Sequence, residues 1–267
     1  MYSGTTFNKK SGSFLGVHQR IDRIARLKIE QYRKGAFFPE IKNILHFEGK
    51  NGPDGIKRKS PARDEPWHYI DPTLPSEGTL LVQISNHQLN LKQAIKVKDE
   101  HRAAFEAAWL AHCVVDGLTP AHHYPLEEKL ERLRGESLLT RTSLRKKLII
   151  SGNSPRQRVK NNWEIWGARG MMTSHVLFEL GVASAMTPAN ISKIVISKID
   201  IETLKNEGFE TIFCRHLAQI HTLKMYDTFR HKGWTRQLAR QTRRDLIPVI
   251  IQSVALAWLS VLVEPDS

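Results

Sequence analysis

Cysteine is scarce in this sequence, and its scarcity excludes several classes of protein. The 267 residues contain only two cysteines, Cys113 and Cys214, which is too few for a disulfide framework. Neither has the Cys-x2-Cys spacing of a structural zinc site. Cys113 lies in an apolar stretch, and we expect it to be part of the core.

Signals for β-structure are also missing. No Asn-Gly or Asp-Gly turn joins two segments of alternating polarity, and no internal repeat of fixed period is present. Apolar residues instead recur at helical spacing. We therefore predict an all-α protein, with a flexible N-terminus at residues 1–13 and a single helical domain over residues 14–267.

The predicted helices are bounded by glycine, proline and polar segments. They cover about residues 14–34, 35–47, 77–98, 103–115, 171–183, 188–206, 208–231 and 246–263. Residues 48–72 are rich in glycine, proline and charge, so a loop is predicted there, with Asp54 in a turn.

The start of the chain contains no hydrophobic signal region, so the protein is expected to be cytoplasmic. One long apolar run, residues 246–263, is at the lower limit of length for a membrane-spanning helix. Pro248 and Gln252 favour a core helix, which is our first interpretation. Membrane association through this apolar helix is the second, because basic residues precede the run and Glu264 follows it.

The composition is basic, with 40 lysines and arginines, 27 acidic residues and a net charge of +13. Such a charge favours nucleic acid, anionic lipid headgroups or phosphorylated substrates, although a basic proteome would give the same composition. Basic residues concentrate in an insertion at residues 127–170. We expect a solvent-exposed arm there, with binding to an anionic membrane surface or to phosphate backbones as the alternative. Trp163 and Trp166 are expected in the core.

The most informative stretch is residues 101–123. It contains an apolar helix in which His112 and Asp116, four residues apart, lie on one face. A further imidazole follows just past the helix, and the spacing favours His122 over His123. Two imidazoles and a carboxylate that converge on one point are suitable ligands for zinc. The alternative is a packed core histidine with an aspartate that ends the helix.

A second pair of the same kind lies farther along the chain. His175 and Glu179 are again four residues apart in an apolar segment. Because burying an unpaired carboxylate costs on the order of several kcal/mol, a shared cation is the simplest reason for two such pairs. His18 and Asp22 form a third pair, in which we take His18 as a ligand and Asp22 as a structural partner of an arginine.

In chain order, these residues resemble the zinc-dependent phospholipase C family and its relatives, the zinc-dependent single-strand-specific nucleases. The family motif His-x3-Asp-x5-His matches His112, Asp116 and His122, and a later His-x3-Glu matches His175 and Glu179. The glutamate favours the phospholipase branch. Family positions that precede the motif correspond here to His18, Asp54 and the His68-Tyr69 pair.

The resemblance implies a single multi-helix bundle with a cleft that holds two or three zinc ions. Asp116 would bridge two of the ions, one held with His68 and His112 and the other with His18. Asp54 would be the general base or would orient the water. The third ion would have the remaining ligands, His122, His175 and Glu179.

The implied activity is hydrolysis of a phosphodiester by a zinc-activated water, with phospholipid headgroups or nucleic acid as substrate. Trp67 and Tyr69 flank His68 and are expected to line the substrate pocket. A single-strand-type nuclease on the same fold is the second hypothesis. The third is a non-catalytic, metal-stabilised helical protein that binds a membrane or nucleic acid.

Two departures from the family pattern affect the site. The family uses a free N-terminal tryptophan as a zinc ligand, whereas this chain begins with Met1 and Tyr2 and has no tryptophan before Trp67. Zinc at His18 is therefore expected to be weak or absent. The second departure is the insertion at residues 127–170, which is expected to cover the cleft, alter substrate choice or bind a partner.

Overall fold

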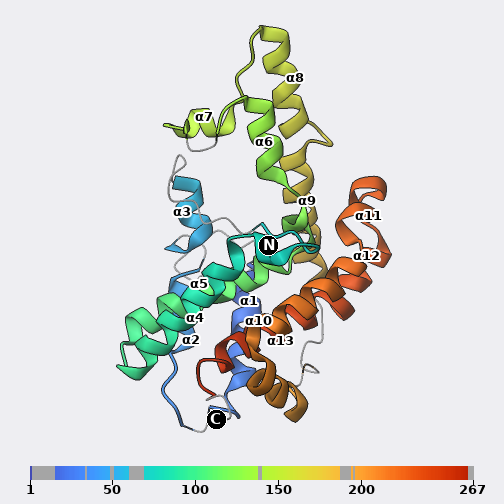
Figure 1. Cartoon of the computed structure of the whole chain (residues 1–267). Coiled ribbons are helices and arrows are strands. Elements are labelled where there is room, and N and C mark those ends of the chain that lie inside the picture. Colours follow the sequence, from blue (N-terminus) through green and yellow to red (C-terminus); the bar gives the residue numbers. More distant parts are fainter. Residues whose placement is uncertain are drawn as a thin grey trace.

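The molecule is built from helices around one long buried helix (Figure 1). The computed structural model describes residues 1, 16–33, 35–48, 51–59, 69–137, 140–186, 194 and 196–263. Every regular element within these residues is helical, which confirms the predicted all-α class. Residues 2–15, which include most of the predicted flexible N-terminus, lie outside the described residues.

The helices in these residues fall into two sets along the chain. The first half contains α1 (Val17–Ile29), α2 (Ile41–His46), α3 (Pro53–Lys59), η2 (Pro75–Glu77), α4 (Leu80–Lys96), α5 (Glu100–Gly117), η3 (Pro120–His123) and α6 (Leu126–Arg134). The second half contains α7 (Leu144–Leu148), α8 (Pro155–Trp166), α9 (Met171–Met186), α10 (Lys198–Thr222), α11 (Met225–Lys232), α12 (Arg236–Gln241), η6 (Thr242–Leu246) and α13 (Ile247–Leu259).

Helix α5 lies at the centre and carries the core. Its N-cap is Asp99, whose side chain accepts a hydrogen bond from the backbone N–H of Arg102 at 2.9 Å. From Ala103 onward almost every residue is buried, because α4, α13, α2 and α1 pack around it. At its end, a Cβ on Gly117 would come within 2.6 Å of the Leu80 side chain, so only glycine fits this close approach.

The C-terminal apolar run forms α13, and it is a core helix. It packs against α1, α5 and α10, and the indole N–H of its Trp258 donates to the carbonyl of Ala107 at 2.9 Å. No helix in the described residues has both the length and the apolar character needed to cross a membrane. The prediction of membrane association through this helix is therefore wrong. The run is apolar on all sides because protein surrounds it on all sides.

Two predicted boundaries differ from the structure. The predicted loop at residues 48–72 contains α3, whose first turn includes Asp54, so Asp54 is helical. The helices predicted at residues 188–206 and 208–231 meet in α10, which is interrupted at Gly208, and the end of the second forms the separate helix α11. Gly208 has a φ of +78°, a conformation that side-chain-bearing residues rarely adopt, so the break depends on glycine.

The basic insertion forms α6, α7 and α8, which project from the rest of the molecule as an arm (Figure 1). Asn161 on α8 connects the segments of the arm, because its side-chain amide donates to the carbonyls of Leu133 and Ser151. Trp163 and Trp166 were expected in the core, but they are 70% and 43% exposed. They lie outward on α8, which belongs to the arm and packs against α9.

Candidate metal centre

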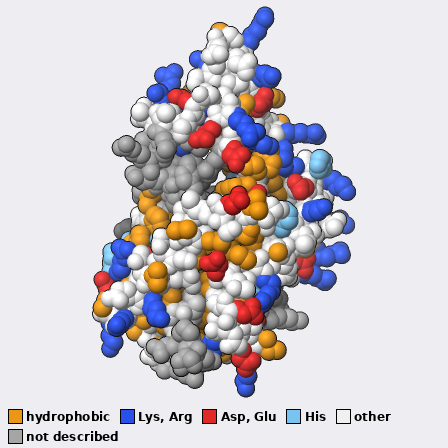
Figure 2. Space-filling view, in the orientation of Figure 1, with side chains coloured by type: hydrophobic (Ala, Val, Ile, Leu, Met, Phe, Trp, Pro, Cys, Tyr) orange, Lys and Arg blue, Asp and Glu red, His pale blue; other side chains and the backbone are white. Residues whose placement is uncertain are grey.

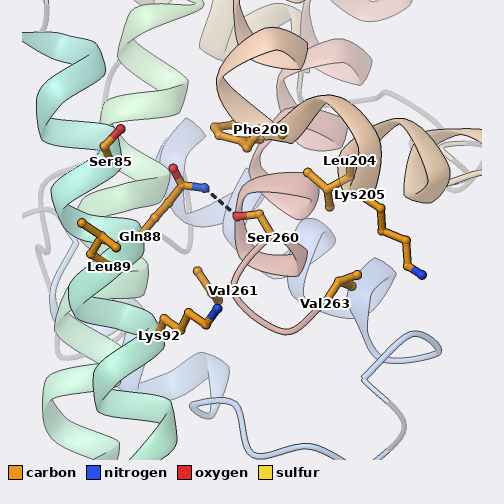
Figure 3. Close-up of a pocket in the computed structure, with 11 residues that line it drawn as sticks. Ser85, Gln88, Leu89, Lys92, Leu204, Lys205, Phe209, Ser260, Val261 and Val263 are labelled. Atoms are coloured by element: carbon orange, nitrogen blue, oxygen red, sulfur yellow. Dashed lines mark hydrogen bonds between the residues drawn. The ribbon is translucent and has the colours of Figure 1, made fainter. Parts of the chain in front are cut away.

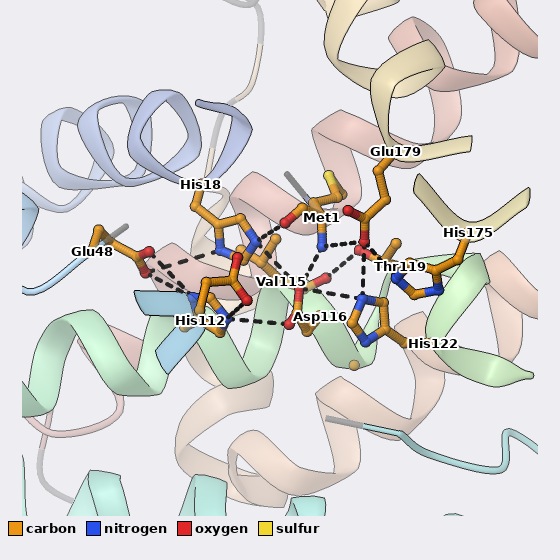
Figure 4. Close-up of polar contacts among 12 residues, drawn as sticks. Met1, His18, Glu48, His112, Val115, Asp116, Thr119, His122, His175 and Glu179 are labelled. Carbon is orange, nitrogen blue, oxygen red and sulfur yellow. Dashed lines mark hydrogen bonds and ion pairs between the residues drawn. The ribbon is translucent and has the colours of Figure 1, made fainter. Parts of the chain in front are cut away.

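Two groups of potential metal ligands meet at the end of α5 that is nearest the arm (Figure 4). The first consists of His18, His112 and Asp116, and the second of His122, His175 and Glu179. Within each group the candidate ligand atoms lie within 4.8 Å of one another. Both groups were expected from the sequence, and the structure brings their members together from α1, α5, η3 and α9.

Asp116 is shared by the two histidines of the first group. Its Oδ2 lies 3.2 Å from Nε2 of His112, and its Oδ1 lies 3.2 Å from Nε2 of His18. The two imidazole rings stack with their centroids 4.2 Å apart. All three side chains are almost completely buried. One carboxylate oxygen therefore faces each imidazole, an arrangement that suits a bridging ligand.

The second group is centred on Glu179. Its Oε1 lies 3.0 Å from Nε2 of His175 and 3.2 Å from Nε2 of His122. His122 is also 3.7 Å from Oδ1 of Asp116, which connects the two groups. His123 points away, because its Nε2–H donates to the carbonyl of Gly117 at 2.9 Å. The structure thus places His122 rather than His123 in the centre.

The backbone of Met1 lies between the two groups. Its amino group is 2.5 Å from Oδ1 of Asp116 and 3.3 Å from Oε1 of Glu179, and its carbonyl oxygen is 2.8 Å from Nε2 of His18. Burial alone lowers the pKa of this amine, but the two carboxylates outweigh it and raise the pKa to about 10. The carbonyl oxygen has lone pairs for a metal, whereas the protonated amine has none and supplies positive charge between the two groups.

Positive charge holds the buried carboxylates in their ionised form. Burial favours the protonated acid, but His122, the Met1 ammonium and His112 hold the pKa of Asp116 well below its usual range. The Met1 ammonium and His175 do the same for the pKa of Glu179, again against burial. Burial lowers the pKa of His122 to about 4, so this imidazole is neutral and has a lone pair for a metal.

Glu48 is a member of the site that the sequence did not reveal. Its carboxylate is 2% exposed and lies 3.2 Å from Nδ1 of His112 and 3.9 Å from Nδ1 of His18. When Nδ1–H of His112 donates to Glu48, Nε2 is left facing Asp116. Glu48 follows a short helix and belongs to no spacing motif, so only the folded structure identifies it.

Asp22 lies beside Glu48. Its surroundings differ from the prediction, in which Asp22 pairs with an arginine. It is fully buried, and neither of its carboxylate oxygens accepts a hydrogen bond from the described residues. Burial and the charge of Glu48 raise the pKa of Asp22 well above its usual range, which favours the neutral carboxyl.

The other predicted residues are only partly described. Oδ1 of Asp54 lies 3.8 Å from Nε2 of His112, and 28% of the Asp54 side chain is exposed, so this carboxylate is accessible to solvent. Trp67 and His68 lie outside the described residues. The chain continues at the half-buried Tyr69 and at Ile70, whose N–H donates to the carbonyl of His122 at 3.2 Å.

The sequence has no significant match among models of known protein families, curated proteins or solved structures. The fit of a metal therefore depends on the chemistry of the donors. Four imidazoles and two carboxylates converge, and the charge between the carboxylates is supplied by a buried ammonium. Nitrogen and oxygen donors in such sets suit zinc, so the described residues fit the ion that the sequence implied.

A separate pocket of ≈ 560 Å³ lies between α4, α10 and the end of α13 (Figure 3). Gln88 donates a hydrogen bond to Oγ of Ser260 across it, at 2.6 Å. The elements that supply the candidate metal ligands, α1, α5, η3 and α9, contribute no lining residue. The pocket contains no imidazole or carboxylate among its described lining residues, so it offers no metal site.

Proposed function

We propose that this protein is a zinc-dependent phosphodiester hydrolase of the phospholipase C type. The observation that carries the proposal is the convergence of two ligand groups, connected through Asp116, from helices far apart in the sequence. The match of these ligands to the family pattern, in order and in spacing, supports the same conclusion. The Met1 ammonium lies between the two buried carboxylates, and a divalent cation bound there would compensate their charge more fully.

Zinc, when bound, supplies a water of lowered pKa and neutralises charge on the phosphoryl oxygens. The protein then contributes a general base and orients the attacking water. Asp54 is a partly exposed carboxylate beside His112, and it takes a proton from the attacking water. The water oxygen forms a bond to phosphorus, the phosphorus–oxygen bond to glycerol breaks, and the departing oxygen takes up the proton that Asp54 accepted. The products are diacylglycerol and a phosphorylated headgroup.

Exposed apolar side chains favour a lipid substrate over nucleic acid. Val176, Leu177 and Leu180 are exposed on α9, beside His175 and Glu179. Further exposed apolar residues lie on the arm, namely Leu144, Leu148, Ile149, Val159, Trp163 and Trp166. Aliphatic groups of this kind suit the interface of a bilayer, whereas nucleic acid offers them no partner.

The charge of the arm is complementary to an anionic membrane surface. Residues 141–160 include seven lysines and arginines and no acidic residue. In the space-filling view, basic side chains project from the arm at the top of the molecule (Figure 2). We infer that the arm brings the metal centre to an anionic bilayer.

A nuclease remains the second candidate, and Trp163 is the observation that favours it. This tryptophan is 70% exposed among basic residues, which is suitable for stacking on an unpaired base. To distinguish a phospholipase from a nuclease, phospholipid and nucleic acid must be tested as substrates with the same protein preparation. Metal content without hydrolysis of either substrate would favour the non-catalytic alternative.

The test is the zinc content of purified protein, measured by elemental mass spectrometry, together with hydrolysis of phosphatidylcholine, phosphatidylinositol and single-stranded DNA. We expect two or three zinc ions per chain, and partial loss in both His112→Ala and His175→Ala. His231→Ala, at an exposed position on α11, is the control and should keep all of them. Absence of metal from the wild type would overturn the proposal, and cleavage of DNA alone would assign the nuclease.

A further inference from the structure

A second pocket, of ≈ 510 Å³, lies where the arm meets the body. We call it the Tyr124 pocket. Its polar lining consists of Tyr124, Lys129, Arg132, Trp163, Glu164, Arg169 and Arg230, contributed by α6, α8, α11 and the segments beside them. Four of these side chains are basic and one is acidic. No residue of this pocket was singled out as a ligand from the sequence, and Trp163 was expected in the core.

Tyr124 organises the positive charge of the pocket. The ammonium of Lys129 lies 4.0 Å from the centre of its ring and also hydrogen-bonds its hydroxyl. The guanidinium of Arg230, from a helix about one hundred residues later in the sequence, lies 4.5 Å from the same ring. Cation–π contacts of this kind fix the direction of both cations. The pocket is therefore a built cationic site rather than a scatter of surface charges.

The Tyr124 pocket adjoins the candidate metal centre. Tyr124 follows His122 by two residues, and the lining residue Met171 precedes His175 by one helical turn on α9. The ring of Tyr226 lies 5.9 Å from the ring of Tyr124 and 5.3 Å from that of Phe178, the neighbour of Glu179. The two sites are therefore joined by α9 and by the short segment that connects His122 to Tyr124.

We propose that the Tyr124 pocket binds a phosphate group on the headgroup of the substrate, in addition to the phosphodiester at the metal centre. This inference rests on the proposed function and makes it specific. Lysine and arginine are the side chains that bind phosphate most strongly. The substrate class is then a phospholipid whose headgroup carries its own phosphomonoester, such as a phosphorylated inositol.

A choline headgroup is disfavoured by the same contacts. A quaternary ammonium is recognised by aromatic faces and carboxylates, but the ring of Tyr124 already has two cations over it. Glu164 is the single carboxylate in the lining and faces four basic side chains. Choline placed in the pocket would therefore be repelled.

The experiment compares two reaction products, inositol 1,4-bisphosphate and phosphocholine, by calorimetric titration into the zinc-loaded protein. Both carry one phosphomonoester for the metal centre, and only the first carries a second phosphate for the pocket. We expect inositol 1,4-bisphosphate to bind the wild type about tenfold more tightly or better. Arg230→Gln and Arg132→Gln should each reduce this ratio several-fold. Both arginines are exposed, so the variants should fold.

The control is Arg236→Gln on α12, which removes the same charge at another exposed position and should leave the ratio unchanged. An affinity ratio near one in the wild type, or a ratio that Arg230→Gln does not change, would overturn the assignment of the pocket as a phosphate site. Hydrolysis of a phospholipid would still support the proposed function in that case. Binding without any hydrolysis would keep the pocket and overturn the function. Displacement of inositol 1,4-bisphosphate by a lower concentration of a short oligothymidylate would reassign the pocket to nucleic acid.

Discussion

At the scale of single residues, the candidate metal centre depends on how its buried charges are compensated. Asp116 and Glu179 are buried with ionised carboxylates, and the pKa of His112 is raised well above its usual range, because Glu48 and Asp116 outweigh the effect of burial. The raised pKa favours the protonated imidazole of His112 when no metal is bound. A divalent cation at Nε2 of His112 would release that proton. Zinc binding should therefore weaken as pH falls.

Glu48 allows a direct test of how the imidazole of His112 is held. Glu48→Gln keeps the shape of the side chain but removes the charge that accepts from Nδ1–H of His112. Removal of an outer-shell carboxylate typically weakens metal binding about 10- to 100-fold. We expect a loss of zinc affinity in this range, measured by competition with a chelating dye. Glu48→Asp should restore part of it.

The matched control for this variant is Glu106→Gln. Glu106 is also fully buried and also contacts an imidazole, with Oε2 2.5 Å from Nδ1 of His87. It is not among the candidate ligands, so its loss should lower stability without changing zinc affinity. Equal zinc affinity in Glu48→Gln and wild type would show that Glu48 does not position His112.

The sequence was sufficient for some of these residues and not for others. His112 with Asp116, and His175 with Glu179, were predictable because residues four apart share a helix face. The meeting of the two pairs depends on η3, which contacts both α5 and α9, and no local pattern encodes these contacts. Glu48 and the backbone of Met1 carry no spacing signal, so they could be found only in the folded chain.

At the scale of elements, α9 is held by a close contact between Gly181 and Trp234. A Cβ at residue 181 would overlap the indole, with two ring carbons only 2.6 Å away. Alanine normally improves a helix interior by about 1 kcal/mol relative to glycine, whereas overpacking costs about 1 to 3 kcal/mol. We expect Gly181→Ala to lower the free energy of unfolding, measured with urea. Ser184→Ala, at an exposed position on α9, should not lower it.

The contact between α10 and α13 should make stability depend on pH. Nδ1–H of His216 donates to Oγ of Ser253 at 2.6 Å, and burial lowers the pKa of His216 below 6.5, partly opposed by Asp200. The folded state therefore holds this imidazole neutral, while the unfolded chain takes up a proton as pH falls below about 6.5. The stability contributed by neutral His216 is present above that pH and is lost as pH falls toward the lowered pKa.

His216→Gln isolates this effect, because glutamine keeps a donor near Ser253 but does not titrate. The urea midpoint of the wild type should fall between about pH 7.5 and pH 5.5 by more than that of His216→Gln. His231→Gln, at an exposed position, should behave as the wild type. Identical falls in His216→Gln and wild type would rule out a contribution from His216.

At the scale of the whole molecule, the sequence predicted that the protein is helical, but it did not predict which segments project outward from the core. The buried helix α5 followed from apolar periodicity, whereas the break at Gly208 within α10 was not predicted from glycine placement. An apolar run was compatible with membrane and with core, and only its neighbours α1, α5 and α10 decide that α13 belongs to the core. Trp163 and Trp166 are exposed because the arm leaves the body, and sequence patterns do not encode the direction of an arm.

The last prediction concerns the arm as a membrane-binding unit. A combined variant with glutamine at Arg145, Lys146, Arg156 and Arg158 removes four exposed positive charges from it. Each basic residue near an anionic surface contributes about 1 kcal/mol, so partitioning onto phosphatidylcholine vesicles with about 20 mol % phosphatidylserine should fall about 100-fold or more.

A control with glutamine at Arg236, Arg240, Arg243 and Arg244 has the same net charge, because these four residues are also exposed. It should retain the binding of the wild type if the arm makes the contact, whereas net charge alone would weaken both variants equally. Binding by the arm should also decline as salt rises, because charges at the bilayer surface are screened. Co-sedimentation of both variants at two salt concentrations therefore separates docking by the arm from attraction by the molecule as a whole.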